Sequence, residues 1–134
     1  MRYMLLVYTK EEEMRRASQE EMGKIRDGHW AVMDETRNKG ILQGAEPLAP
    51  ITTATTVRHQ NGKAVVTDGP FAETKEQLAG YYILDCKDLD EAISYAARIP
   101  TGCGGSTGCI EIRPFREVPA RTGPVTPTEA QVSA

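Results

Sequence analysis

The sequence predicts an α+β domain with a ferredoxin-like, split βαβ arrangement, in which two helices cover one face of an antiparallel sheet. Strand-like apolar runs and two capped amphipathic stretches follow one another in the order strand, helix, two or three strands, strand, helix, strand. The chain of 134 residues also has the length of one domain with a modest core, whose incomplete burial favours help from a partner chain.

The first two predicted elements are a buried strand and a long helix. The run RYMLLVY, from Arg2 to Tyr8, is rich in strand formers, and the charged TKEEE after it predicts a solvated loop. The capping-box spacing of Ser18 and Glu21 and a stop at Gly40 predict a helix over residues 18–39. Its core-facing stripe spans roughly 100° and contains Met22, Ile25, His29, Val32, Met33 and Thr36.

The middle of the chain is rich in strand signals. A brief strand is expected in ILQGAEPLAP, and TATTVRH and KAVVT follow as two β-rich runs. The Asn61-Gly62 pair between these runs is typical of a type I′ hairpin turn. The next predicted strand is LAGYYILDC, from Leu78 to Cys86.

A second helix and a last strand complete the predicted domain. Asp88 and Glu91 again have capping-box spacing, and Pro100 ends a helix over residues 88–99. The face expected to pack on the sheet contains Leu89, Ala92, Ile93, Ala96 and Ile99. The last strand is the alternating CIEIRPF, from Cys109 to Phe115.

The second face of the predicted sheet needs a cover, because two helices can cover only one face. Residues such as Leu6, Tyr82 and Ile112 are expected there, and an exposed apolar sheet face marks an interaction site. A second copy of the chain is the simplest cover, so we expect a homodimer.

Charge and hydropathy exclude several classes of partner. Sixteen Lys and Arg against nineteen Asp and Glu give a net charge of −3, without the basic footprint of a nucleic-acid binder. No apolar run approaches the roughly 18 residues of a membrane span. The apolar part of the opening segment is too short for a signal peptide. We therefore expect a cytoplasmic protein that binds neither nucleic acid nor membrane.

The cysteines and glycines predict neither a metal site nor a cofactor. Cys86, Cys103 and Cys109 are odd in number and are expected to be free thiols. The gap in CGGSTGC is wider than that of a zinc clip, so a flexible turn before the last strand is favoured. The same segment lacks the Lys of a phosphate-binding loop.

The C-terminal segment, residues 119–134, is expected to lie outside the domain. It reads PARTGPVTPTEAQVSA, with three prolines and no aromatic residue. This composition predicts a tail or a strap across a partner.

One long motif carries a family resemblance. The stretch VTDGPFAETKEQLAGYYILD, with RYMLLVY near the start and IEIRPF near the end, resembles the YCII-related family in the branch named for its DGPF motif. The resemblance covers roughly residues 1–117, which is almost all of the predicted domain, residues 1–118. It implies a dimeric α+β barrel of ferredoxin-like protomers.

The resemblance also points to a site on the first helix. The wider family includes a dehydrochlorinase of a chlorinated hydroxyhydroquinone, for which a His paired with an Asp is suggested as the active centre. In HWAVMDETRNKG, His29 precedes Gly40 by eleven residues and matches the family's helix His. The family's Asp, just before a Pro after the second helix, corresponds here to Ile99.

The residues themselves leave the chemistry of this site open. His29, with an ordinary pKa of about 6.5, suits general acid or base work or is a core His bonded to backbone. Asp68 either takes the role of the missing Asp or caps the amides of its turn. Phe71 either packs or binds substrate.

The charged residues after the turn are Glu73, Lys75 and Glu76, which either solvate an edge or form the lip of a pocket. Arg58, His59 and Arg113 lie in or beside strands, where each could meet an anionic ligand.

Three functions remain open from sequence. The first is an enzyme that binds a small organic substrate and uses His29 for proton transfer in a lyase- or hydrolase-like step, with Asp68, Phe71, Glu73, Lys75 and Arg113 as further site candidates. The second is a non-catalytic dimeric binding or regulatory module linked to sigma-factor control, since several family members are encoded beside such factors. The third is a scaffold without ligand, favoured if His29 and the DGPF turn are fully packed.

Overall fold

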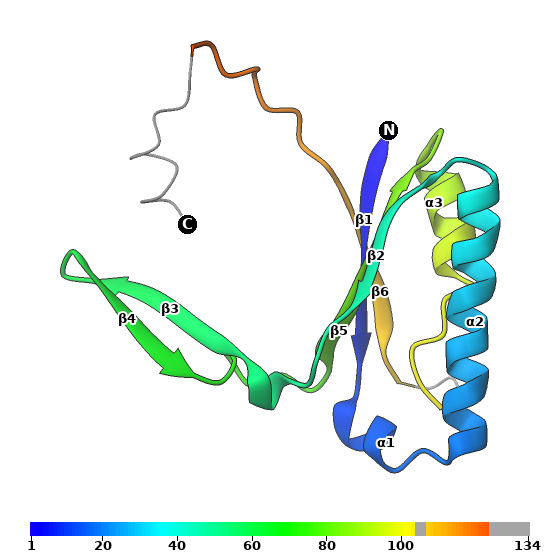
Figure 1. Ribbon diagram of the computed structural model, residues 1–134, viewed down its shortest axis with the longest axis horizontal. Coiled ribbons are helices and arrows are strands. Elements are labelled where there is room, and N and C mark those ends of the chain that lie inside the picture. Colours follow the sequence, from blue (N-terminus) through cyan, green and yellow to red (C-terminus); the bar gives the residue numbers. More distant parts are fainter. Residues whose placement is uncertain (104–106, 124–134) are drawn as a thin grey trace.

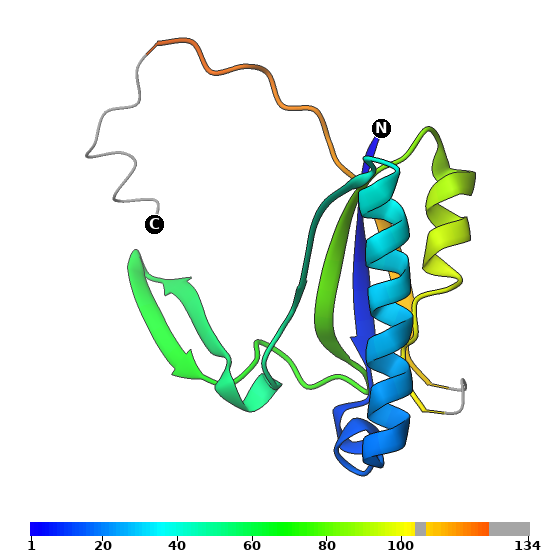
Figure 2. The same ribbon diagram turned by 45° about the vertical axis from the view of Figure 1, so that its right-hand side comes forward.

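A four-stranded antiparallel sheet with two helices on one face forms the body of the protein (Figure 1). The computed structural model describes residues 1–103 and 107–123. The sheet order is β2-β5-β1-β6, with strands β1 (Arg2–Thr9), β2 (Leu42–Pro47), β5 (Gln77–Asp85) and β6 (Cys109–Pro114). Helices α2 (Gln19–Asn38) and α3 (Leu89–Ala96) lie side by side against it (Figures 1 and 2). The predicted α+β, ferredoxin-like fold is confirmed.

The core lies between the helices and the inner face of the sheet. Side chains of β1 and β5 alternate, so every second residue points toward the helices. The buried apolar set consists of Tyr3, Leu5, Val7, Val32, Tyr82, Leu84, Cys86, Ala92, Tyr95 and Ile99. Thr36 is fully buried among them, and its hydroxyl donates to the Val32 carbonyl at 2.7 Å.

The long helix forms where its capping residues predict it. The Ser18 hydroxyl accepts from the Glu21 amide at 3.1 Å, and the Glu21 carboxylate accepts from the Ser18 amide at 3.2 Å. The helix ends at Asn38, and Gly40 then adopts a φ of +73°, where glycine is favoured. These local contacts fix both ends of α2.

The strand register corrects the residues expected on the uncovered face of the sheet. Leu5 pairs with Tyr82 on one side and with Ile112 on the other, and directly paired residues share a face. Because Leu5 is buried beneath the helices, Tyr82 and Ile112 point inward, and their predicted place beside Leu6 is wrong. The uncovered face, called the open face below, instead carries Met4, Leu6, Tyr8, Tyr81 and Ile83.

Two helical predictions also need correction. The segment expected to be a solvated loop contains a short helix, α1 (Glu11–Arg15), whose acidic first turn suits a helix N-terminus. Helix α3 has the predicted Asp88 cap but ends at Ala96 instead of residue 99. Leu89 and Ile93 lie toward one edge of the predicted stripe and are exposed, because the buried side follows Ala92, Tyr95, Ala96 and Ile99.

A hairpin projects from the body on the side of the sheet away from the helices (Figures 1 and 2). After the short turn η1 (Ile51–Thr53), strands β3 (Thr55–Gln60) and β4 (Lys63–Asp68) form a separate two-stranded sheet, called the arm below. Asn61 and Gly62 have φ values of +51° and +76°, so the predicted type I′ turn is confirmed.

The remaining predictions concern segments that the structure describes only in part. Residues 104–106 of the expected glycine-rich turn and residues 124–134 of the expected tail lie outside the described residues, and residues 119–123 are exposed. Within residues 1–103 and 107–123, no helix has the length and hydropathy needed to cross a membrane.

Candidate functional site

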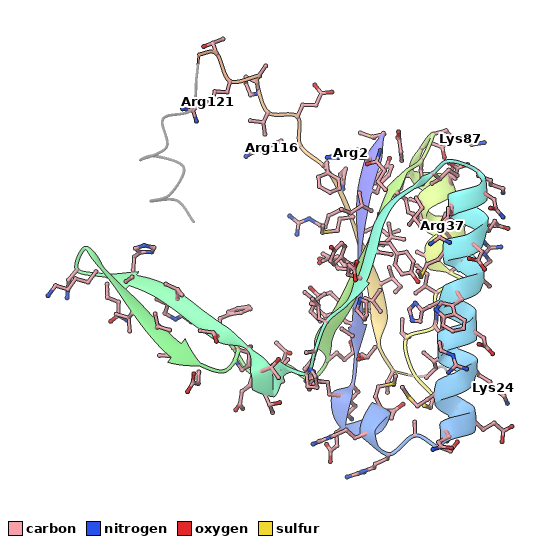
Figure 3. All side chains as sticks on the ribbon, in the orientation of Figure 1. Arg2, Lys24, Arg37, Lys87, Arg116 and Arg121 are labelled. Atoms are coloured by element: carbon pink, nitrogen blue, oxygen red, sulfur yellow. The ribbon has the colours of Figure 1, made fainter. Side chains whose placement is uncertain are left out.

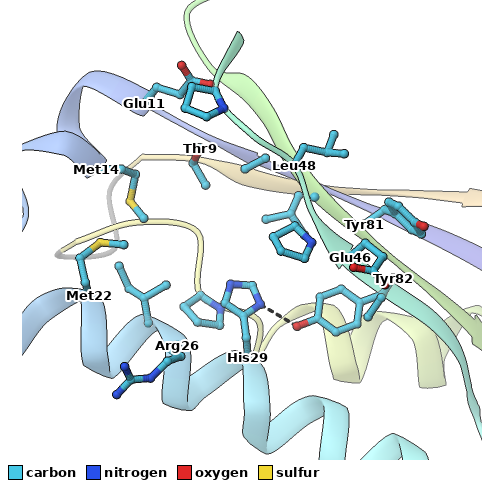
Figure 4. Close-up of a pocket in the computed structure, with 18 of the residues that line it drawn as sticks. Thr9, Glu11, Met14, Met22, Arg26, His29, Glu46, Leu48, Tyr81 and Tyr82 are labelled. Carbon is cyan, nitrogen blue, oxygen red and sulfur yellow. Dashed lines mark hydrogen bonds between the residues drawn. The ribbon is translucent and has the colours of Figure 1, made fainter. Parts of the chain in front are cut away.

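A cavity of about 670 Å³ lies between α2 and the inner face of the sheet, toward the β2 edge (Figure 4). Residues from β1, α1, α2, β2 and β5 line it, together with the segment that leads to the arm. Most of the lining is apolar and includes Met14, Met22, Ile25, Trp30, Met33 and Leu48. The cavity therefore suits a small molecule with a large apolar surface.

His29 and Tyr82 supply a hydrogen-bonded polar pair in this apolar lining. His29 lies on the inner side of α2, and Tyr82 lies near the middle of β5. The His29 Nδ1 is 2.6 Å from the Tyr82 hydroxyl, and the two rings are nearly parallel with centroids 5.9 Å apart (Figure 4). Both residues line the cavity, so a bound molecule would meet this pair.

Burial sets the protonation of the pair. Desolvation lowers the pKa of His29 below its ordinary value of 6.5, and a hydrogen bond to the Pro100 backbone opposes this effect. Desolvation raises the pKa of Tyr82 to about 12. At neutral pH the site therefore holds an uncharged imidazole beside a protonated phenol. The imidazole can accept a proton, and the phenol can donate a hydrogen bond.

The position of Pro100 beside His29 depends on a glycine in α2. A Cβ atom on Gly28 would come within 2.8 Å of the Pro100 ring, so glycine allows the segment after α3 to approach the helix closely. Ile99, the residue before this proline, is buried in the core. Isoleucine has no carboxylate, so Ile99 cannot pair with His29 as the family's Asp would. The side-chain partner of His29 is instead the hydroxyl of Tyr82, which reaches it from the sheet.

Polar contacts of α1 hold one side of the cavity in place. The Glu11 carboxylate accepts from the Ile51 amide at 3.0 Å, and the Glu11 amide donates to the Gln77 side chain at 2.9 Å. These contacts join α1 to the segment that leads to the arm and to β5.

Arg26 lies over the ring of Trp30, with its guanidinium carbon 5.0 Å from the ring centroid.

Comparison with known proteins identifies the family. A model of the YCII-related domain matches residues 1–118. The chain belongs to the YCII-related family. This YCII-related protein is also 41% identical over 115 residues to "Uncharacterized protein R00369" of Rhizobium meliloti (strain 1021), and the match covers 86% of this chain and 92% of that protein. The printed name of that relative assigns no activity.

The DGPF loop, residues 68–76 of this YCII-related protein, lies apart from the cavity. Of the residues that the structure describes, none from 66 to 78 lines the cavity. Asp68, Glu73 and Lys75 are exposed. Phe71 is 74% exposed. The prediction that its ring packs is therefore wrong for the single protomer. Substrate contacts by these residues stay predictions.

Arg113, another predicted substrate-binding residue, lies on the opposite side of the sheet from the cavity. It is exposed in β6 and pairs with Met4 on the open face. A contact between Arg113 and a ligand also stays a prediction.

The end of the charged run has a structural role that the sequence left open. The Glu76 carboxylate accepts a hydrogen bond from the Gly108 amide, and the Gln77 side chain donates to the Thr74 carbonyl at 2.8 Å. The first contact ties the DGPF loop to the start of β6, and the second is a local contact at the end of the loop. The residues after the sharp turn thus lead the chain from the arm back into the central sheet.

Tyr82 is the site residue that sequence reasoning did not find. It lies 53 residues from His29 in the chain, and only the strand register brings the two together. The alternation of β5 contains a usable signal, since Tyr82 and the apolar Leu84 are two residues apart and must share a face.

Proposed function

We propose that this YCII-related protein binds a small, mostly apolar molecule in the cavity and that His29 transfers a proton in a lyase- or hydrolase-like step. The observation that carries the proposal is the 2.6 Å contact between His29 and Tyr82 at the wall of a cavity of about 670 Å³. Small-molecule sites commonly have roughly this volume and combine an apolar lining with a few placed polar groups.

The neutral imidazole makes His29 the base in this proposal. The Tyr82 hydroxyl passes its proton to His29 Nδ1 while the Tyr82 oxygen takes a proton from the ligand, and the imidazolium that forms has two N–H groups to satisfy. The Tyr82 oxygen and the Pro100 backbone are the partners that support such a charged ring. The surrounding apolar side chains lower the local dielectric constant and so strengthen these contacts.

A non-catalytic module is the second candidate, and one observation favours it. The partners of His29 in the described part of the chain are Tyr82 and the Pro100 backbone, and neither is a carboxylate. A general base is normally oriented by such a group. In this alternative the cavity binds a metabolite, and the protein supports sigma-factor control in the cytoplasm.

We also propose that the protein is a homodimer of the DGPF-motif branch, formed through the open face. Met4, Leu6 and Ile83 support this because they are apolar and only half-buried in the protomer. The exposed site candidates Asp68, Phe71, Glu73, Lys75 and Arg113 lie apart from the cavity, so we propose them for a separate ligand contact near the junction of the two subunits.

Trp30 makes ligand binding directly measurable. It is the single tryptophan of the chain, and it lines the cavity. We expect a library of small organic molecules to contain compounds that change Trp30 fluorescence and raise the melting temperature of the wild-type protein.

A matched pair of variants localises this binding. Ala45 lines the cavity, so Ala45→Phe is expected to fill part of it and weaken binding by about tenfold or more. Ala97 is exposed on the surface, so Ala97→Phe is expected to leave binding unchanged. A screen without hits, or hits that bind both variants equally, would contradict the proposed site.

A further inference from the structure

We propose that the arm, residues 55–68, packs against the open face of a second copy of the chain, so that two arms are exchanged about a two-fold axis. This inference rests on the proposed homodimer and goes beyond it, because it assigns the cover of the open face to one segment. It is independent of any ligand in the cavity.

The arm has an apolar side that its own protomer leaves uncovered. Every residue of β3 and β4 except Thr56 is exposed. Val57 and Val66 are directly paired and share one face of the hairpin, where they are 56% and 63% exposed. An isolated two-stranded hairpin is marginally stable in water, so such a face gains stability from a covering surface.

The open face is a complementary apolar surface. Met4, Leu6 and Tyr8 of β1 point away from the helices beside Tyr81 and Ile83 of β5, and each is only half-buried. The arm leaves the body on this same side of the sheet, as both ribbon views show (Figures 1 and 2). A second body placed beside the open face therefore comes within reach of the arm.

The basic residues of the arm lie away from its apolar side. Arg58 pairs with Val65 and Lys63 pairs with Gln60, on the side of the hairpin opposite Val57 and Val66. The open face bears two exposed charges of opposite sign, Glu111 opposite Leu6 and Arg113 opposite Met4. Figure 3 shows the side chains of the arm extending into the space around the hairpin. The side of the arm that carries Val57 and Val66 can therefore pack on the open face without burying Arg58 or Lys63.

The same chain carries both surfaces, which determines the symmetry. The arm of each subunit contacts the open face of the other, so the two contacts are identical and the pair closes as an isologous dimer. A stable interface of this kind buries about 1,600 Å² in total. Each of the two exchanged arms would bury part of this area against the other subunit.

Analytical ultracentrifugation of two neighbouring variants tests the proposal. Val66→Asp places a charge on the docking side of the arm, whereas Val65 pairs with Arg58 on the other side, so Val65→Asp is the matched control. We expect a wild-type dimer and an increase in its dissociation constant of about 100-fold or more for Val66→Asp. The expected change for Val65→Asp is less than about tenfold.

The outcomes separate the arm from the dimer itself. A wild-type protein that stays monomeric at about 100 μM, where a dimer with a micromolar dissociation constant would be mostly assembled, would overturn both proposals. A dimer that Val66→Asp leaves as tight as the wild type would overturn the arm contact alone. Circular dichroism of each variant verifies that the protein is folded.

Cross-linking supplies a second measurement that needs no substitution. Wild-type chains labelled with ¹⁴N and ¹⁵N are mixed and treated with a carbodiimide, which joins a lysine to a neighbouring carboxylate. We expect mixed-label peptide pairs that connect Lys63 to a carboxylate beside the partner's open face. Pairs containing Lys63 that always carry a single label would overturn the exchange of arms.

Discussion

Replacing His29 with alanine is expected to reduce turnover of a substrate bound in the cavity by a factor of about 10²–10⁴, the usual contribution of a general base. The structural reason is that His29 is the imidazole at the cavity wall and is held neutral by burial. The measurement is kcat and KM separately, on a compound found through the Trp30 fluorescence screen. We expect the loss in kcat, because the cavity that binds the substrate is retained.

Two further variants provide the controls for this prediction. Tyr82→Phe keeps the ring in the core but removes the hydroxyl that contacts His29, so it is expected to lower kcat without unfolding the protein. Thr36→Val alters a buried polar group of α2 that does not line the cavity, and kcat is expected to stay unchanged. An unchanged kcat for His29→Ala would show that His29 is not the base, whereas cavity ligands that the wild-type protein binds without turnover would favour the non-catalytic module.

Replacing Leu84 with alanine is expected to lower the free energy of unfolding by about 2–5 kcal/mol. Leu84 is 0% exposed and lies in the core between the sheet and the helices. Its truncation removes apolar contacts and leaves a void in a closely packed region. The measurement is urea unfolding at a fixed protein concentration, since a dimer would make the midpoint depend on concentration.

Leu89→Ala is the matched control, since Leu89 was expected in the core from its helical spacing but is 48% exposed. We expect this variant to lose less than about 1 kcal/mol. If Leu89→Ala lost as much free energy of unfolding as Leu84→Ala, Leu89 would have to be buried, as its helical spacing predicts, and not exposed as in the structure.

The parts of the fold that the sequence predicted well are those determined by neighbouring residues. Ser18 and Glu21 form their capping box across three residues, and Asn61-Gly62 forms its turn without help from the body. The strand and helix order then follows, and with it the ferredoxin-like topology.

The parts that were missed depend on contacts between distant residues. Tyr82 reaches His29 only because Leu5 pairs with Tyr82 and thereby places it beneath α2. Sequence periodicity gives two faces to a strand but does not say which one the helices cover. The projection of the arm could not be predicted from sequence either. Its β-rich runs are as compatible with a central strand of the sheet as with a separate hairpin.

The pH dependence of stability follows from the lowered pKa of His29. The folded protein binds a proton at this group less readily than the unfolded chain, whose His has a pKa of about 6.5. Between the two pKa values the unfolded state therefore holds more protons. The contribution of His29 to stability is complete above pH 6.5 and decreases as the pH falls through the lower, folded pKa.

NMR titration of the His29 imidazole tests whether this residue is a neutral base at the cavity wall. The chain has two histidines, so a His59→Gln variant, changed in the exposed arm, assigns the His29 signals. We expect a His29 pKa below 6.5 and ring signals that shift when a cavity ligand is added. A His29 pKa at or above 6.5, with signals that no cavity ligand changes, would contradict it.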